Sequence, residues 1–190
     1  MSQHHLIVGG QRSGKSRHAE SLAMEWLRRA GCRRVSVIAT ARPADEEMRE
    51  RIERHQRERP VAFDTVEAPL ALANTLRVHD DPTRLLLVDC LTLWLTNWLM
   101  PADEKPDHAA WCAERDALTA VLRELRSPVV MVSNEVGWGV VPMSRQVREF
   151  VDELGRLNQA AAACCGRVTL MVAGQAWTRG VGPACIGGAT

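Results

Sequence analysis

The chain has 190 residues, of which 46% are hydrophobic and 25% are charged, which is enough for one globular domain with a sizeable core. With a formal net charge of +1, no basic excess points to nucleic acid, so any anion site must be local. No apolar run approaches the roughly 20 residues of a membrane span, and the N-terminus lacks the pattern of a signal peptide. We therefore expect no membrane span.

The cysteines predict reduced thiols rather than a disulfide framework or a metal cluster. They form no C-x-x-C pair, and no cysteine cluster stands near histidines at metal-ligand spacing. Reduced thiols are the rule inside cells, so we expect a cytoplasmic protein whose cysteines mostly fill its core. The six are Cys32, Cys90, Cys112, Cys164, Cys165 and Cys185.

Short apolar runs bounded by polar or turn residues are typical of buried parallel strands. They cover residues 5–10, 34–40, 84–90, 128–134 and 167–174. Helical patterns lie between them at 15–30, 43–58, 68–78, 91–100, 107–126 and 143–165. This alternation predicts an α/β fold whose mostly parallel sheet is flanked by helices. We expect one catalytic domain over residues 1–175 and a Gly-rich tail over residues 176–190.

The segment "GGQRSGKS" follows the first predicted strand, opens the first predicted helix and matches G-x-x-x-x-G-K-[ST]. Glycines let backbone N–H groups approach phosphate oxygens, and the helix N-terminus adds partial positive charge. The alternative, a chance glycine-rich turn, does not account for the full motif in this context. We therefore predict a nucleoside triphosphate site, although the motif does not specify the reaction. Its residues are Gly9, Gly10, Gln11, Arg12, Ser13, Gly14, Lys15 and Ser16.

The charged stretch "RIERHQRERP" contains one histidine, His55. Met48, Ile52 and His55 share one face of the predicted helix, so the imidazole should point toward the protein body. Several interpretations remain open on these residues: a packed histidine beside a solvated charged face, an arginine-rich lid over phosphates, or a nucleophile that attacks phosphorus.

Two further strand ends carry polar residues. Asp89 ends the run "LLLVD" and is expected to hold Mg²⁺ together with the Ser16 hydroxyl, the alternative being a cap for the next helix. The strand 128–134 leads into "SNEVGWGVVP", whose Asn-Glu pair and spaced glycines are typical of an active-site loop in an open α/β sheet. Arg148 and Asn158 are the polar residues of interest in the helix that follows.

The combination of these motifs resembles the bifunctional adenosylcobinamide kinase / adenosylcobinamide-phosphate guanylyltransferase family. A phosphate loop is shared by many families, but H-x-x-x-R-P and N-E-V-G-x-G-x-x-P together are specific. The resemblance implies a P-loop, RecA-like fold in three layers. It is carried by "GGQRSGKSRHAE", "VIATA", "EEMRERIERHQRERP", "LLVDCLTLWLTNWL", "SNEVGWGVVP" and "GRLNQAAA", which are spread over most of residues 6–175.

The resemblance also implies roles for individual residues. His55 occupies the position of the histidine that forms a covalent guanylyl intermediate in this family. Lys15 would act on the phosphates, and Asp89 keeps a carboxylate where some members have glutamate. The positions that match nucleotide contacts are Thr40, Ala41, Arg42, Gln56, Arg57, Glu58, Arg59, Glu67 and Asp89.

The implied chemistry has two steps, with ATP and GTP as substrates and Mg²⁺ as cofactor. Adenosylcobinamide is first phosphorylated, and its phosphate then receives GMP. The family forms homo-oligomers, so we expect one here, a trimer by resemblance. The helical segment "LTLWLTNWLM" would suit an interface but would equally suit the sheet, and Trp94, Trp98 and Trp138 are candidates for contact with a large, partly apolar substrate.

Other classes of function remain to be distinguished. A plain P-loop kinase would use residues 51–59 as an arginine lid and would transfer only the γ-phosphate. A regulatory GTPase would ordinarily carry N/T-K-x-D, which the sequence lacks. A structural or nucleic-acid-binding protein would leave the phosphate loop unexplained.

Overall fold

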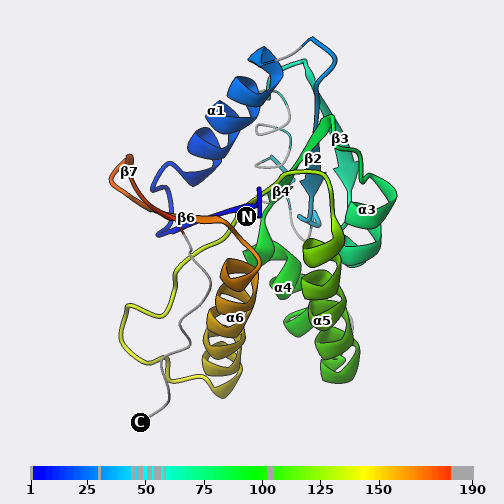
Figure 1. Cartoon of the computed structure of the whole chain (residues 1–190). Helices are drawn as coiled ribbons and strands as arrows, with labels where there is room; N and C mark the ends of the chain where they lie inside the picture. Colours follow the sequence, from blue (N-terminus) through cyan, green and yellow to red (C-terminus); the bar gives the residue numbers. More distant parts are fainter. Residues whose placement is uncertain are drawn as a thin grey trace.

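The computed structural model shows one β-sheet flanked by helices (Figure 1). The residues that the structure describes are 2–29, 31–43, 46, 49–50, 53, 57, 59–101 and 105–180. Within this part of the chain, none of the helices is both long enough and apolar enough to cross a bilayer.

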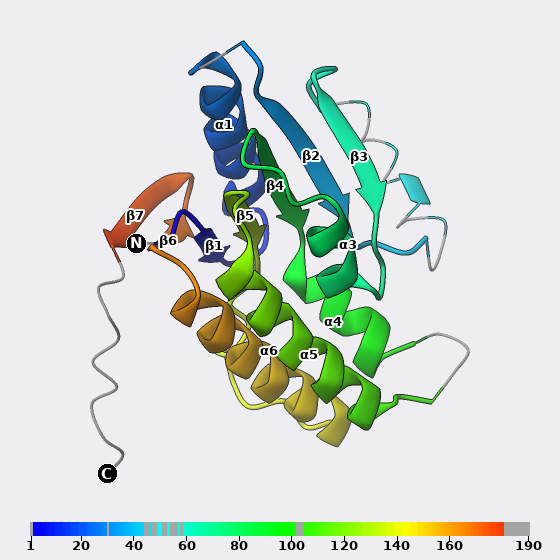
Figure 2. The same cartoon turned by 45° about the vertical axis from the view of Figure 1, so that its right-hand side comes forward.

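The sheet has seven strands among the described residues, in the order β3-β2-β4-β5-β1-β6-β7. All neighbouring pairs are parallel except β6 and β7, which are antiparallel. The strands are β1 (His5–Gly9), β2 (Arg34–Ala39), β3 (Phe63–Glu67), β4 (Arg84–Asp89), β5 (Val129–Val132), β6 (Arg167–Val172) and β7 (Gln175–Gly180). The arrowheads of β2, β3 and β4 point to one edge in Figure 2. Polar residues that follow these strands therefore gather at one edge.

Helices cover both faces of the sheet. α1 packs on one face through Ala19 and Ala23, against strand residues such as Val37 and Leu87. The remaining helices pack on the other face, where residues such as Leu72, Trp94 and Leu157 belong to the same apolar cluster as Val88. The helices are α1 (Lys15–Arg28), α3 (Leu72–Val78), α4 (Leu91–Leu99), α5 (His108–Glu124) and α6 (Arg145–Ala163). The predicted α/β P-loop fold in three layers is confirmed.

The central strands form where they were predicted because both of their faces are buried. β4 and β5 have apolar residues on both faces of the sheet, and these pack under helices on each side. α4 belongs to the core: Leu91, Trp94, Leu95 and Leu99 are all buried. Most of its apolar surface therefore faces the protein interior.

Two strands at the edges of the sheet were not predicted. In β3 only Phe63 is fully buried, and every residue of β7 is exposed. Each of these strands has a single neighbour, so neither needs the continuous apolar run that marks a central strand. Residues 176–180, which the sequence analysis assigned to the tail, form most of β7. Residues 181–190 lie outside the described part.

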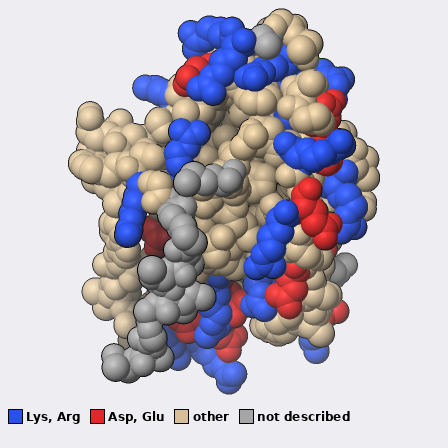
Figure 3. All heavy atoms as spheres, in the orientation of Figure 1, with Lys and Arg blue, Asp and Glu red and all other residues tan. Residues whose placement is uncertain are grey.

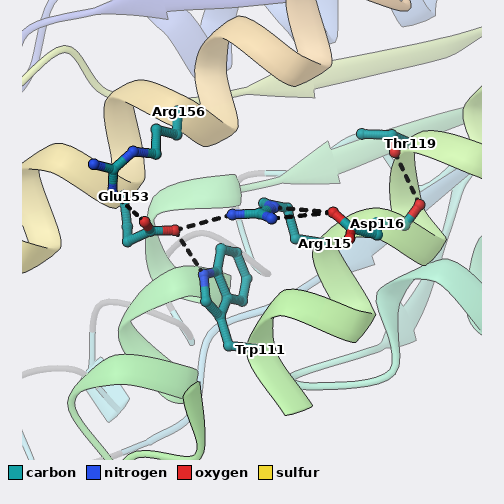
Figure 4. Close-up of polar contacts among 6 residues, drawn as sticks. All are labelled: Trp111, Arg115, Asp116, Thr119, Glu153 and Arg156. Carbon is teal, nitrogen blue, oxygen red and sulfur yellow. Dashed lines mark hydrogen bonds and ion pairs between the residues drawn. The ribbon is translucent and has the colours of Figure 1, made fainter. Parts of the chain in front are cut away.

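A polar cluster joins α5 to α6 (Figure 4). The carboxylate of Glu153 accepts hydrogen bonds from Trp111 Nε1 at 2.9 Å, from Arg115 at 3.3 Å and from Arg156. Burial opposes the ionisation of Glu153, but these hydrogen bonds and the two guanidinium charges outweigh it and lower the pKa of the carboxyl group. The cluster stabilises the contact between the two long helices on that face of the sheet.

Candidate active site

The phosphate loop connects β1 to α1, as predicted. Gly9 ends the strand, and Gly14 adopts φ 98° immediately before Lys15, the first residue of the helix. A Cβ atom at Gly9 would lie 2.3 Å from the carbonyl oxygen of Met171 in β6. This is a steric clash, and glycine avoids it because it has no Cβ atom. Gly9 and Gly14 are therefore required by the geometry of the loop itself.

Polar groups in the loop are held by the neighbouring backbone. The ammonium group of Lys15 donates to the carbonyl oxygen of Gly10 at 2.6 Å, and Lys15 is largely buried. The N–H of Gly174, in the turn between β6 and β7, donates to the carbonyl oxygen of Ser13 at 3.1 Å. The Ser13 hydroxyl is buried without a hydrogen-bond partner among the described residues. Such a group suits a loop that binds an anion, since a phosphate oxygen would accept its proton.

Thr40, the residue after β2, is hydrogen-bonded to Cys90, the residue after β4. Its hydroxyl donates to the carbonyl oxygen of Cys90 at 2.7 Å and lies 2.9 Å from the Cys90 N–H, which donates to it. The side-chain amide of Asn97 donates to the carbonyl oxygens of Thr40 and Pro69, at 2.7 and 2.8 Å. Thr40 is completely buried, so its side chain serves to position the loop that continues into Ala41 and the exposed Arg42.

Asp89 lies at the same edge of the sheet, with Arg59 beside it. One guanidinium nitrogen of Arg59 lies 3.3 Å from Asp89 Oδ2, and another lies 3.4 Å from the hydroxyl oxygen of Thr65. The structure therefore brings together two of the predicted nucleotide-site residues. Burial and the negative charge of Asp89 raise the pKa of the adjacent Cys90 thiol to about 11, so this thiol stays protonated and is no nucleophile at neutral pH.

The other predicted nucleotide-site residues either lie farther along this edge of the sheet, are exposed, or fall outside the described residues. Glu67 ends β3 as an exposed residue, and it is aligned with Ala39, which is in turn aligned with Asp89. Arg57 is exposed. His55, Gln56 and Glu58 lie outside the described residues.

The predicted magnesium ligands fit the chemistry of that ion. Ser16 is the second residue of α1, and Asp89 ends β4. A hydroxyl and a carboxylate are hard oxygen ligands, and Mg²⁺ usually takes few protein ligands besides phosphate oxygens and water. In the described part of the chain no group of three or more His, Cys, Asp or Glu residues is arranged to hold a metal ion. The predicted pair, one hydroxyl and one carboxylate, suits an ion whose other ligands are phosphate oxygens and water.

Two residues near the phosphate loop were not predicted as site residues. The backbone N–H of Glu135 donates to the carbonyl oxygen of Gly9 at 3.1 Å. Its carboxylate accepts from the amide of Asn158 at 3.0 Å. The Asn-Glu pair and Asn158 were both noted in the sequence, but their proximity depends on α6 returning beside the end of β5, which no local pattern indicates.

Charged side chains of both signs are interspersed over the face seen in Figure 3, around a centre with few of them. The described residues of this face form no continuous field of one sign, in agreement with the small net charge. Among the described residues on this face, the charges do not form the broad basic footprint of a nucleic-acid-binding protein.

The family described as "Cobinamide kinase / cobinamide phosphate guanyltransferase" has a model that matches residues 5–178. The chain belongs to this family. It is an enzyme with two activities, a cobinamide kinase and a cobinamide phosphate guanyltransferase, as the sequence resemblance implied.

Curated relatives agree with this assignment. The bifunctional adenosylcobalamin biosynthesis protein CobP of Pseudomonas aeruginosa is 52% identical over 169 residues, which cover 89% of this chain and 92% of that protein. The bifunctional adenosylcobalamin biosynthesis protein CobU of Escherichia coli is 40% identical over 178 residues, covering 89% and 95%.

Among solved structures, the P4 protein from bacteriophage phi13 matches with a TM-score of 0.42 and 17% identity. The match covers 92% of this chain and 53% of the phage protein, so the chain spans about half of that protein's length. A likeness at this level carries no argument about function.

Proposed function

We propose that the enzyme phosphorylates adenosylcobinamide with ATP or GTP and then transfers GMP from GTP to the resulting phosphate through a guanylyl-histidine at His55. The product is adenosylcobinamide-GDP. The observation that carries this proposal is the Arg59–Asp89 ion pair, because it joins the end of the H-x-x-x-R-P motif to the sheet edge where the phosphate loop lies.

In the kinase reaction, the phosphate loop holds the triphosphate of the donor. In this proposal, backbone N–H groups of the loop and the N-terminus of α1 bind the phosphates, and Lys15 balances negative charge on the group being transferred. Ser16 and Asp89 would hold Mg²⁺, which neutralises charge on the phosphate oxygens when it is bound.

In the transferase reaction, an imidazole nitrogen of His55 attacks the α-phosphorus of GTP. A phosphorus–nitrogen bond forms, the bond from the α-phosphorus to the bridging oxygen breaks, and pyrophosphate leaves with that electron pair. An oxygen of the substrate phosphate then attacks the same phosphorus and releases the imidazole. Arg59 lies four residues after His55 in the sequence, and its contact with Asp89 places a cation at the same sheet edge as the phosphate loop.

The test is to incubate the protein with GTP labelled at the α-phosphate and then to denature it. We expect label on the wild-type protein that survives alkali and is lost in acid, as a phosphorus–nitrogen bond requires. His55→Ala should carry none, and the matched control His108→Ala, at an exposed position of α5, should be labelled like the wild type. Label that survives acid or persists in His55→Ala would contradict the intermediate and leave a plain P-loop kinase.

Lys15→Ala tests whether the two reactions share one nucleotide site. Both need an oriented triphosphate, so we expect both to be impaired. Full guanylyl transfer by this variant would show that the reactions use separate sites.

The proposal includes a homo-oligomer in the cytoplasm, a trimer by family resemblance. The loop after β5 exposes several apolar side chains, which supports contact with a second subunit or with a large, partly apolar substrate. The described cysteines are free thiols, which supports a reducing compartment. Light scattering on the purified protein would give the oligomeric state. The exposed side chains are Val136, Trp138, Val140, Val141 and Met143.

A further inference from the structure

The chain segment that leaves β5 lies between the two predicted phosphate-binding elements. β5 pairs with β1 on one side and with β4 on the other. Val132, its last residue, is aligned with Ile7 of β1 and with Asp89 of β4. Residues that follow Val132 are therefore directed to the space between the phosphate loop and the Asp89 carboxylate, where the terminal phosphate of a nucleotide is expected.

The pairing with β1 continues beyond the end of the strand. The N–H of Ser133 donates to the carbonyl oxygen of Ile7 at 2.9 Å, and the N–H of Glu135 donates to that of Gly9 at 3.1 Å. Gly9 is the first residue of the phosphate loop. The backbone of Glu135 is thus fixed against that loop at hydrogen-bond distance.

The side chain of Glu135 is held as well. Asn158, which is buried, uses its amide nitrogen to donate to Glu135 Oε1 and to the carbonyl oxygen of Asn134, both at 3.0 Å. Its amide oxygen accepts from the Ser133 hydroxyl at 2.6 Å. The buried side chain of Asn158 therefore holds three successive residues, Ser133 to Glu135. It also fixes the orientation of the Glu135 carboxylate.

Glu135 differs from the other acids at this edge. Asp89 is paired with the guanidinium of Arg59, and Glu67 ends β3, three places from β5 in the sheet. In the described part of the chain Glu135 forms no ion pair, and a neutral amide, that of Asn158, donates to its carboxylate. The Glu135 carboxylate can therefore accept a hydrogen bond from a substrate hydroxyl without first breaking an ion pair.

We propose that Glu135 is the general base of the kinase reaction and that Asn158 is the residue that positions it; the inference rests on the proposed function. Glu135 takes the proton of the substrate hydroxyl as its O–H bond breaks, and the oxygen forms a bond to the γ-phosphorus. The bond from that phosphorus to the β–γ bridging oxygen breaks, and the nucleoside diphosphate leaves with the electron pair. The proton later passes from Glu135 to solvent.

The second reaction does not need this base. Its acceptor is a phosphate, which is already largely ionised at neutral pH because the second pKa of a phosphate ester is about 6. Loss of the base should therefore separate the two activities. No such separation is expected for a residue that binds the triphosphate common to both.

The test is Glu135→Gln, which keeps an oxygen to accept from Asn158 but removes the basic carboxylate. The two reactions are assayed separately: phosphorylation of adenosylcobinamide by ATP, and GMP transfer from GTP to adenosylcobinamide phosphate prepared beforehand. We expect the kcat of phosphorylation to fall by about 10²–10⁴-fold, the usual contribution of a general base. GMP transfer and labelling by α-labelled GTP should be unchanged. Glu149→Gln, the same substitution at a surface position of α6, is the matched control and should alter neither reaction.

Asn158→Ala tests the positioning role. It should lower the kcat of phosphorylation while leaving the KM for adenosylcobinamide and the rate of GMP transfer unchanged. Unaltered phosphorylation by Glu135→Gln would overturn the proposal, and so would an equal loss of both reactions, which would indicate a role in fold or triphosphate binding. A wild-type protein that does not phosphorylate adenosylcobinamide would instead refute the proposed function on which the inference rests.

Discussion

Arg59 and Asp89 form an ion pair, with 3.3 Å between the guanidinium nitrogen and the carboxylate oxygen, and both side chains are largely withdrawn from solvent. The two residues are far apart in the sequence. They meet because Arg59 precedes β3, Asp89 ends β4, and only β2 lies between these two strands in the sheet. The pair therefore joins the segment before β3 to the centre of the sheet. Its partly buried position makes it different from the surface ion pairs of this protein.

A double-mutant cycle of Arg59→Ala and Asp89→Ala should reveal this coupling. Removing either partner leaves the other charge without its counterion in a mostly buried place, so the two free-energy losses should not add. We expect an interaction energy of about 0.5–3 kcal/mol, measured by denaturant unfolding without nucleotide.

The exposed pair Arg145–Glu149 provides the control for that cycle. It is an i, i+4 pair on α6 with side chains 86% and 46% exposed. Pairs of this kind contribute about 0.3–0.5 kcal/mol. An Arg59–Asp89 coupling no larger than that of the control would contradict a structural role for the buried pair.

Gly9 and Gly10 should respond very differently to the same substitution. A Cβ atom at Gly9 would lie 2.3 Å from the Met171 carbonyl oxygen and 2.8 Å from Ser13 Oγ, whereas at Gly10 no atom lies within 4 Å of the added carbon. Gly9→Ala should therefore lower the free energy of unfolding by at least about 1–3 kcal/mol, as overpacking does.

Gly10→Ala is the matched control, and its free energy of unfolding should change by less than about 0.5 kcal/mol. Thermal or denaturant unfolding of both variants gives the comparison without reference to nucleotide. Equal effects at the two positions would show that β6 does not restrict the start of the phosphate loop.

The sequence predicted the elements whose signal is local. β4 was predicted because a buried strand is a continuous apolar run. The phosphate loop was predicted because G-x-x-x-x-G-K-[ST] is a contiguous motif that can be read directly in the sequence. The edge strands β3 and β7 lack such a run. The Asn158–Glu135 contact was not predicted either, since it joins residues 23 apart through the return of α6. Pairing across elements depends on topology, which periodicity does not contain.

Burial of His5 should make the protein less stable as pH falls. Burial, together with the positive charges of Arg167 and His18, lowers the pKa of the imidazole from 6.5 to about 4, and its Nε2 lies 2.7 Å from the Thr169 hydroxyl oxygen. The native state therefore keeps His5 neutral. Its stabilising contribution is full above the unfolded pKa of 6.5 and is lost as pH falls toward about 4, by up to roughly 3 kcal/mol.

Denaturant unfolding across this pH window, with His5→Gln beside the wild type, measures the effect. Glutamine does not titrate, so the fall in stability with acid should be smaller in the variant. Some fall should remain because burial also lowers the pKa of His4, despite its hydrogen bond to the Leu122 carbonyl oxygen. The same pH dependence in both proteins would contradict the role of His5.

Two carboxylates that contact the same arginine should differ in their contribution to stability. Arg115 contacts Glu153 of α6 and Asp116 of α5, whose side chains are 17% and 71% exposed (Figure 4). Glu153→Gln should lower the free energy of unfolding at neutral pH by about 1.5–3 kcal/mol, because hydrogen bonds to Trp111, Arg115 and Arg156 lose their charge. Asp116→Asn should cost at most about 1 kcal/mol, since water solvates that carboxylate.

The pH dependence of the same two variants gives an independent check. The pKa of Glu153 is lowered in the native state, so its contribution is present above the ordinary value of 4.5 and is lost as pH falls through the lowered native value. The difference in free energy of unfolding between the wild type and Glu153→Gln should therefore shrink in acid. The corresponding difference for Asp116→Asn is small already at neutral pH, so it has little room to shrink. A Glu153→Gln penalty that stays constant down to strongly acidic pH would show that packing between α5 and α6, rather than charge, accounts for it.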